Sequence, residues 1–115
     1  YNPSFSSGLN DLTTVDHKMG LWVHITSLGD GNLTVYGDYG TSTTIDLKAG
    51  WNLVGYPAQS EKTVSDSLSG TGYTRVEAYS STSPYVQVLS DSDMMSPGNG
   101  YWVHVNADAQ WTIDW

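Results

Sequence analysis

Residues 100–105 read GYWVHV, and residues 20–25 of the same chain read GLWVHI. Two kinds of side chain alternate in both stretches, which is the period-2 pattern of a β-strand with one face against a core. We expect the core face of the two strands to consist of Tyr101, Val103, Val105, Leu21, Val23 and Ile25. The other face then carries Trp102, His104, Trp22 and His24.

The two stretches belong to a longer repeat. Segment 1–36 aligns with segment 81–114, whereas the middle of the chain, 37–80, occurs once. In repeat proteins, a unit relies on its neighbour to cover its apolar face. We therefore expect a single β domain over residues 1–115, in which the two copies pack opposite each other about a pseudo-two-fold axis.

The same alternation recurs along the chain between turns rich in Gly, Pro, Asp and Asn. It predicts strands at 21–26, 32–36, 43–47, 51–55, 74–79, 85–89, 101–105 and 110–115. The residues between the third and fourth strands predict a three-residue hairpin loop, in which Gly50 supplies a positive φ. Thr63 to Asp66 resembles a capping box and indicates one short helix or helical turn over 63–69. About eight short strands and one short helix make an all-β domain, either a sandwich or a partly closed barrel.

Composition and charge exclude several classes of function. The net charge is −8, and the four Lys and Arg residues are scattered, so we expect no nucleic-acid binding through phosphate contacts. No apolar stretch is long enough for membrane insertion, and the chain has no cysteine for disulfides or thiolate metal sites. The first residue is Tyr1 rather than Met, which fits a processed or excised piece of a larger protein.

Aromatic residues are the main candidates for ligand binding. The chain has five Trp and eight Tyr but one Phe, a bias that suits half-buried sheet faces and binding surfaces. The Trp/His face of the two related strands either covers a second packing layer or forms a platform for a sugar ring. We prefer the packing interpretation, because a sheet this rich in Trp needs Trp for its own core. The candidate ligand-binding residues are Trp22, His24, Trp102, His104, Tyr36, Tyr39 and Tyr85.

Metal and catalytic sites are not predicted. His24 and His104 have no further His or carboxylate at a ligand spacing, so they do not indicate a metal site. Asp91 and Asp93 are the candidates for a calcium site, but we prefer Asx-turns there and expect no cofactor. No GxSxG elbow is present and no pattern places a serine beside a histidine, so we expect no catalytic residues and no enzyme.

Asn32 begins the sequence Asn-Leu-Thr, which is an acceptor for N-glycosylation. The predicted position at a turn is where an acceptor has to lie. This sequon adds a candidate glycosylation site and points to an extracellular setting.

Two longer motifs carry a family resemblance. Residues 46–57 read DLKAGWNLVGYP and residues 94–105 read MMSPGNGYWVHV. They resemble a β module of large archaeal, and some bacterial, cell-surface and secreted proteins, in which a W-x-I type strand closes the module, here at 110–115. The resemblance covers nearly the whole chain, although the first copy has DHKMG where the second has SPGNG. It implies an exported protein with a non-enzymatic role and brings no catalytic residues with it.

The sequence therefore predicts a non-enzymatic, extracellular module for structure or adhesion within a larger surface or secreted protein. Its expected partners are other domains of that protein, components of the cell envelope, or glycans. One alternative is a carbohydrate-binding module appended to a secreted enzyme, which requires exposed aromatic side chains in a row. A second alternative is an accessory domain of a secreted peptidase or hydrolase. We expect Trp51, Trp102 and Trp111 to lie in or near the core. Gly55 is expected at a β-bulge or at a place where another segment approaches the strand closely.

Overall fold

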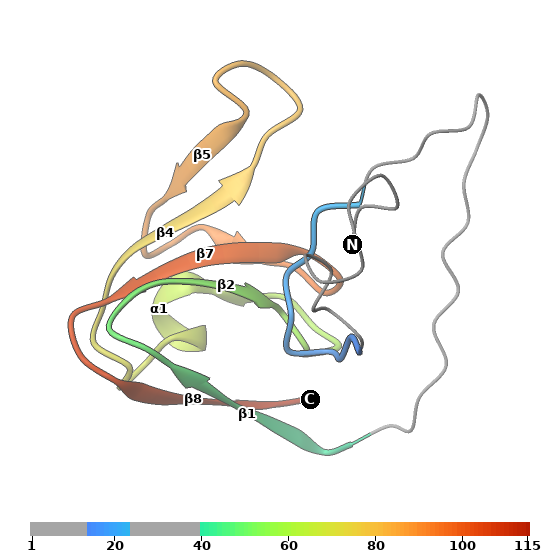
Figure 1. Ribbon diagram of the computed structural model, residues 1–115, viewed down its shortest axis with the longest axis vertical. Coiled ribbons are helices and arrows are strands. Elements are labelled where there is room, and N and C mark those ends of the chain that lie inside the picture. Colours follow the sequence, from blue (N-terminus) through green and yellow to red (C-terminus); the bar gives the residue numbers. More distant parts are fainter. Residues whose placement is uncertain (1–13, 24–39) are drawn as a thin grey trace, which may run out of the picture.

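The computed structural model describes residues 14–23 and 40–115 of the chain (Figure 1). The strands are β1 (Ser42–Leu47), β2 (Gly50–Gly55), β3 (Lys62–Thr63), β4 (Tyr73–Tyr79), β5 (Val86–Leu89), β6 (Met94–Met95), β7 (Gly100–Val105) and β8 (Ala109–Asp114), and the helix is α1 (Val64–Ser67). The predicted all-β class with a short helix is confirmed. The sheets do not close into a barrel, so the architecture is a sandwich.

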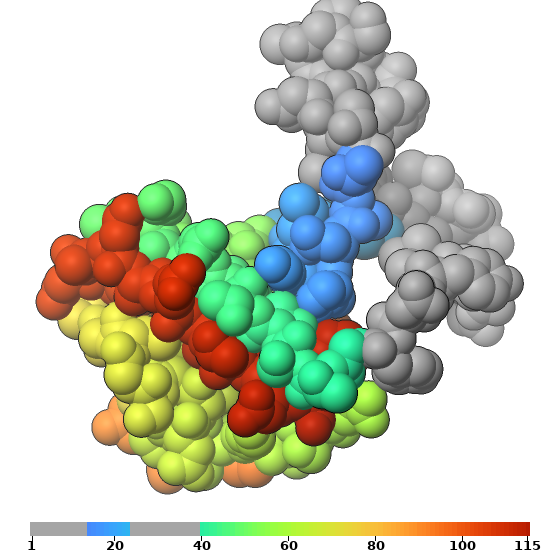
Figure 2. Space-filling view, turned by 90° about the horizontal axis from the view of Figure 1, so that it is seen from below, coloured from blue at the N-terminus to red at the C-terminus, as the bar shows by residue number. Residues whose placement is uncertain are grey.

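The strands form three antiparallel sheets. The main sheet has the order β2-β7-β4-β5, the cover sheet pairs β1 with β8, and a small sheet pairs β3 with β6. The cover sheet lies beneath the main sheet in Figure 1. Figure 2, which views the molecule from below, shows β1 and β8 side by side across that side of the molecule.

The core lies between the main sheet and the cover sheet. Burial alternates along β7, where Tyr101, Val103 and Val105 are buried and the residues between them are half-buried. From β8, Trp111 is 1% exposed, and its indole stacks on Tyr56 with the ring centroids 6.4 Å apart. The predicted core face of the second copy is therefore confirmed, and so is the predicted burial of Trp111.

The short helix α1 fills one part of this core. The Thr63 hydroxyl accepts a hydrogen bond from the Asp66 N–H at 3.2 Å and so caps the helix N-terminus. Val64 and Leu68 lie four residues apart and are fully buried. The predicted helical turn over 63–69 is confirmed in a shorter form, since its helical residues are Val64–Ser67.

The predicted hairpin between 43–47 and 51–55 is wrong. β1 pairs with β8 and β2 pairs with β7, so these consecutive strands lie in different sheets. Gly50 does have a positive φ of 99°, but the turn carries the chain from one layer of the sandwich to the other. Both strands can then turn apolar residues into the same core. Asn52 holds the turn, since its side chain accepts from the Lys48 N–H and donates to the Lys48 carbonyl.

The expected strand and core face of the first copy are not found in the described residues. Residues 21–23 form no strand, and Leu21 and Val23 are exposed. The reason is that the side chains from Ile45 to Ile113 already fill the space between the two sheets. The rest of segment 1–36, apart from 14–20, lies outside the described residues, so the pseudo-two-fold relation stays a prediction.

Candidate functional site

One face of the main sheet points away from the core, and we call it the outer face. Alternation along each strand and the cross-strand register assign to it Trp51, Leu53, Arg75, Glu77, Tyr79, Val86, Val88, Trp102 and His104. Several large apolar members are exposed, with Trp51 at 51%, Tyr79 at 54% and Val88 at 53% of their surface. An apolar face of this kind on a soluble protein is typical of an interaction site.

The position of Trp51 corrects the prediction that this residue lies in the core. Asn52 is the reason, because its amide closes the turn before β2 and makes a contact to the Val103 carbonyl on the inner side. Trp51 and Leu53 must then point outward, since successive strand residues face opposite sides. Trp102, which was also expected in or near the core, is half-buried.

The repeated tryptophans of the two copies meet on the outer face. The indole of Trp22 lies beside that of Trp102 with ring centroids 5.7 Å apart and planes inclined by 42°. Tyr79 at the end of β4 contacts Trp22 edge-on, with centroids 5.1 Å apart and an interplanar angle of 89°. Trp22 itself is 65% exposed, so this contact covers one side of the indole and leaves the other in solvent.

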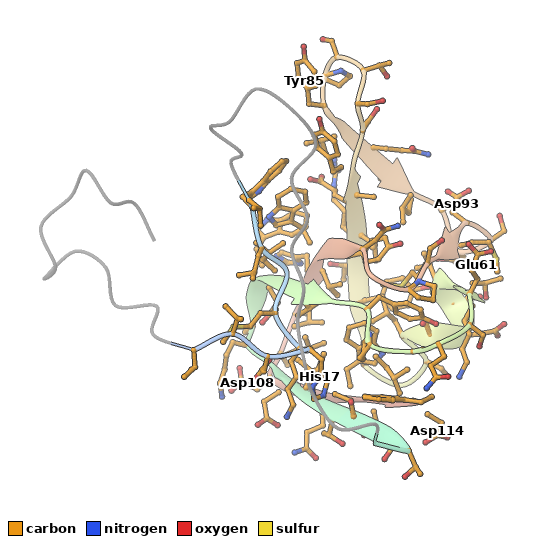
Figure 3. All side chains as sticks on the ribbon, turned by 90° about the vertical axis from the view of Figure 1, so that its right-hand side faces the viewer. His17, Glu61, Tyr85, Asp93, Asp108 and Asp114 are labelled. Atoms are coloured by element: carbon orange, nitrogen blue, oxygen red, sulfur yellow. The ribbon has the colours of Figure 1, made fainter. Side chains whose placement is uncertain are left out.

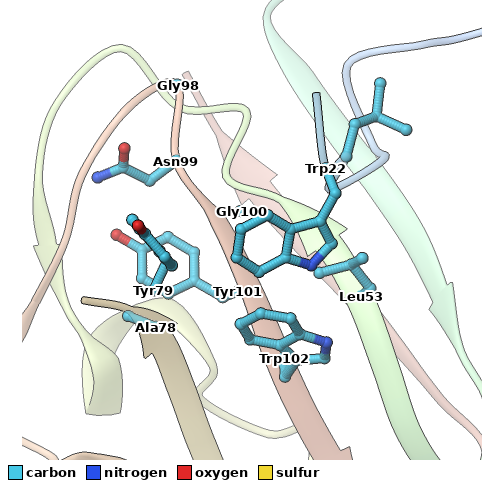
Figure 4. Close-up of a pocket in the computed structure, with 10 residues that line it drawn as sticks. Trp22, Leu53, Ala78, Tyr79, Gly98, Asn99, Gly100, Tyr101 and Trp102 are labelled. Atoms are coloured by element: carbon cyan, nitrogen blue, oxygen red, sulfur yellow. The ribbon is translucent and has the colours of Figure 1, made fainter. Parts of the chain in front are cut away.

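These three rings border a pocket of about 260 Å³ (Figure 4). In the view of Figure 4 the two tryptophans lie to the right and Tyr79 and Asn99 lie to their left, and the ring of Tyr79 contacts that of Trp22. The remaining walls are aliphatic side chains and the backbone of the turn before β7. None of the lining side chains that the structure describes carries a formal charge at neutral pH. Arg75 and Glu77 of the outer face form an ion pair with each other, in which Arg75 Nε donates to Glu77 Oε1 at 2.6 Å.

Residues 17–20 fix the position of Trp22 by docking against the edge of β2. The Lys18 carbonyl accepts the Gly55 N–H at 2.8 Å, and Met19 forms an isolated β-bridge with Val54. A side chain at Gly55 would place its Cβ 2.8 Å from the Met19 carbonyl oxygen, so only glycine allows this approach. The prediction that another segment approaches Gly55 closely is confirmed.

His17 extends this docking contact to the cover sheet. Its Nε2 shares a hydrogen bond of 2.9 Å with the Thr43 hydroxyl, and its ring meets Trp115 edge-on at a centroid distance of 5.5 Å. The segment that carries Trp22 is therefore attached to both layers of the sandwich.

His104 has a local structural environment on the outer face. Its Nδ1 shares a hydrogen bond of 2.8 Å with the Thr74 hydroxyl, and its ring meets Trp51 edge-on. Both contacts are made within the main sheet, by Thr74 of β4 and Trp51 of β2. Within residues 14–23 and 40–115, no group of three or more His, Asp or Glu side chains is placed to hold a metal ion.

Asp91 and Asp93, the calcium candidates, are engaged in loop geometry. Asp91 accepts the Tyr73 hydroxyl at 2.7 Å, a hydrogen bond that raises the pKa of Tyr73. Asp93 accepts both the N–H and the hydroxyl of Ser90, and these bonds lower the pKa of the Asp93 carboxyl. The backbone carbonyls of the same two residues accept N–H groups from the first turn of α1. Their side chains and backbone thus brace the loop against the helix.

The other predicted site residues do not join the pocket in the described structure. Tyr85 is exposed near the tip of the β4–β5 hairpin, which projects from the body of the molecule (Figure 3). His24, Tyr36, Tyr39 and the glycosylation candidate Asn32 lie outside the described residues.

Two pocket residues were missed from the sequence. Tyr79 was assigned only to a strand, although its alternation with the buried Val76 would have placed it on the outer face. The sequence places Asn99 only in a turn, and nothing in its neighbours along the chain indicates that the turn faces Trp22.

No helix in the described ranges 14–23 and 40–115 has the length and apolar character needed to cross a membrane. No family model matches the chain, and no curated protein and no solved structure is significantly similar to it.

Proposed function

We propose that this chain is a non-enzymatic adhesion and structural module of a larger surface or secreted protein, and that it makes its contacts through the outer face. The observation that carries the proposal is the exposure of Trp51, Tyr79 and Val88 together on one face of the main sheet. Interaction sites of soluble proteins are enriched in such aromatic side chains. The motif resemblance to a module of archaeal surface proteins supports the same role.

The arrangement of the core supports a modular unit over residues 40–115. Every buried apolar side chain of the described residues lies between Ile45 and Ile113, so this unit fills its own core. The two ends of the unit lie together, because the Trp115 N–H donates to the Thr41 carbonyl at 3.0 Å.

The environment of the described histidines supports a non-catalytic role. His17 and His104 share hydrogen bonds with the hydroxyls of Thr43 and Thr74. Neither histidine is hydrogen-bonded to a carboxylate that would orient it as a general base in the manner of a catalytic triad.

Adhesion to intact cells of the source organism tests the proposal. We would measure binding of the fluorescently labelled chain by flow cytometry, for the wild type and for a variant with Trp51→Ser and Val88→Ser. Met94→Ser is the matched control, because Met94 is an exposed apolar residue of the small sheet away from the outer face. We expect the double variant to lose binding and the control to retain it. Failure of the wild type to bind cells would contradict the adhesion role, and equal binding by the double variant would contradict the choice of face.

A further inference from the structure

The pocket between Trp22, Trp102 and Tyr79 has properties that the flat remainder of the outer face does not share. Three rings from three separate segments border one cavity, and they do not lie in one plane, because Trp22 is inclined by 42° to Trp102 and by 89° to Tyr79. Trp22 and Tyr79 are each more than half exposed, so their ring faces are open to a ligand. The ring of Trp22 contacts the other two, so together the three form one uneven aromatic wall of the pocket, against which a small ring can pack more closely than a flat protein surface.

The charge of the pocket restricts the class of ligand. Among the described residues every side chain that lines it is uncharged, and Arg75 and Glu77 of the outer face neutralise each other in a 2.6 Å pair. A phosphate, a carboxylate or an amine would give up its hydration here without gaining an opposite charge. The pocket therefore selects a neutral ligand.

The size and the polar groups restrict the ligand further. A volume of about 260 Å³ lies just below the range of about 300 to 1,000 Å³ that is usual for pockets of drug-sized ligands. It has room for one ring with substituents that leave through the open side. The Asn99 amide can both donate and accept hydrogen bonds, and the Tyr79 hydroxyl can do the same. A suitable ligand thus has an apolar ring face for the indoles and a rim of hydroxyl groups for Asn99 and Tyr79.

We propose that this pocket binds one pyranose ring of a neutral glycan, which stacks against Trp22 and Trp102 and donates to or accepts from Asn99. The inference rests on the proposed function, since it names the ligand of the same outer face. A pyranose combines an apolar face of C–H groups for the indoles with a polar rim that can hydrogen-bond to the Asn99 amide. The ligand would pack against both copies of the repeated sequence, because Trp22 and Trp102 come from one copy each.

Titration of the full chain with defined sugars, followed by NMR and calorimetry, tests this inference. The probes are the methyl glycosides of glucose, galactose, mannose and N-acetylglucosamine, with glucuronic acid as a charged comparison and a proline-rich peptide as a comparison of another class. We expect at least one neutral glycoside to shift the indole N–H resonances of Trp22 and Trp102. The variants Trp22→Ala and Asn99→Ala should each weaken its binding, about tenfold or more for the stacking residue.

Tyr85→Ala is the matched control, because Tyr85 is an aromatic residue with similar exposure outside the pocket. It should bind the same glycoside with an unchanged dissociation constant. The inference is overturned if no neutral glycoside shifts the indole resonances, if glucuronic acid or the peptide binds in preference, or if Trp22→Ala binds like the wild type. Cell adhesion that persists while sugar binding is absent would refute the sugar pocket and leave the proposed function standing. Loss of both would refute both.

Discussion

Replacing Trp111 by phenylalanine should lower the free energy of unfolding by about 2 to 4 kcal/mol. Trp111 is 1% exposed, and its indole N–H donates to the Ser67 carbonyl at 2.6 Å. Phenylalanine has no donor, so this carbonyl at the end of α1 would stay buried without its partner, at a cost of about 1 to 3 kcal/mol. The smaller ring also leaves a void beside Tyr56, which adds about 1 kcal/mol for the lost apolar contact.

Chemical unfolding followed by circular dichroism is the suitable assay, because the substitution itself alters tryptophan fluorescence. A thermal melt followed by the same signal should show a melting temperature lower by at least about 8 °C, because in a domain of this size each kcal/mol corresponds to about 4 to 8 °C. Trp22→Phe is the matched control: the same chemical change at an exposed tryptophan should stay within about 0.5 kcal/mol. A Trp111→Phe variant as stable as this control would refute the buried hydrogen bond and the packing that we infer around it.

Three further predictions concern the module and its loops. A fragment of residues 40–115 should unfold cooperatively in urea, since it contains the whole described core; a gradual transition would show that the core needs segment 1–36. The hydrogen bonds from Ser90 lower the pKa of the Asp93 carboxyl below its ordinary value of 3.8. These bonds therefore stabilise the fold fully at pH values above 3.8, and the stabilisation is lost as the pH falls through the lower pKa of the folded state. Asp93→Asn should therefore be less stable than the wild type at pH 7, with a difference that vanishes in strong acid; a difference that does not depend on pH would argue against this contact. Gly55→Ala should displace residues 17–20 from β2. The displacement should increase the quenching of Trp22 fluorescence by iodide relative to the wild type. Unchanged quenching would contradict the docking contact.

The strand pattern predicted the central part of the fold well. β7 lies between β2 and β4, so each of its side chains faces either the core or the outer face, and the alternation of GYWVHV records this directly. The same pattern could not predict the partner of β1. A hairpin and a turn between layers both require a positive φ at Gly50, so Gly50 does not distinguish the two. The turn between layers is held by Asp108, which lies far along the chain and accepts the Ala49 N–H at 2.9 Å.

The candidate site was predictable only in part, for a similar reason. The repeat drew attention to Trp22 and Trp102 as a related pair, and the structure places them beside each other. Tyr79 and Asn99 come to the pocket through the pairing of β4 with β7 and through the turn that precedes β7, and neither contact leaves a local trace in the sequence. The hydrophobicity of Trp51 suggests the core, and this prediction is wrong. The Asn52 side chain has to bond to the Lys48 backbone in the turn, so Asn52 points to one face of the sheet and Trp51 points to the other.

The pairing of β1 with β8 has a mechanical consequence. Ser42 at the start of β1 lies opposite Asp114 at the end of β8, so the chain enters and leaves the unit at the same end of one antiparallel ladder. A force that pulls Thr41 and Trp115 apart would load the backbone hydrogen bonds of that ladder one after another rather than all together. Under such a force the unit would therefore begin to unzip from its ends at low tension.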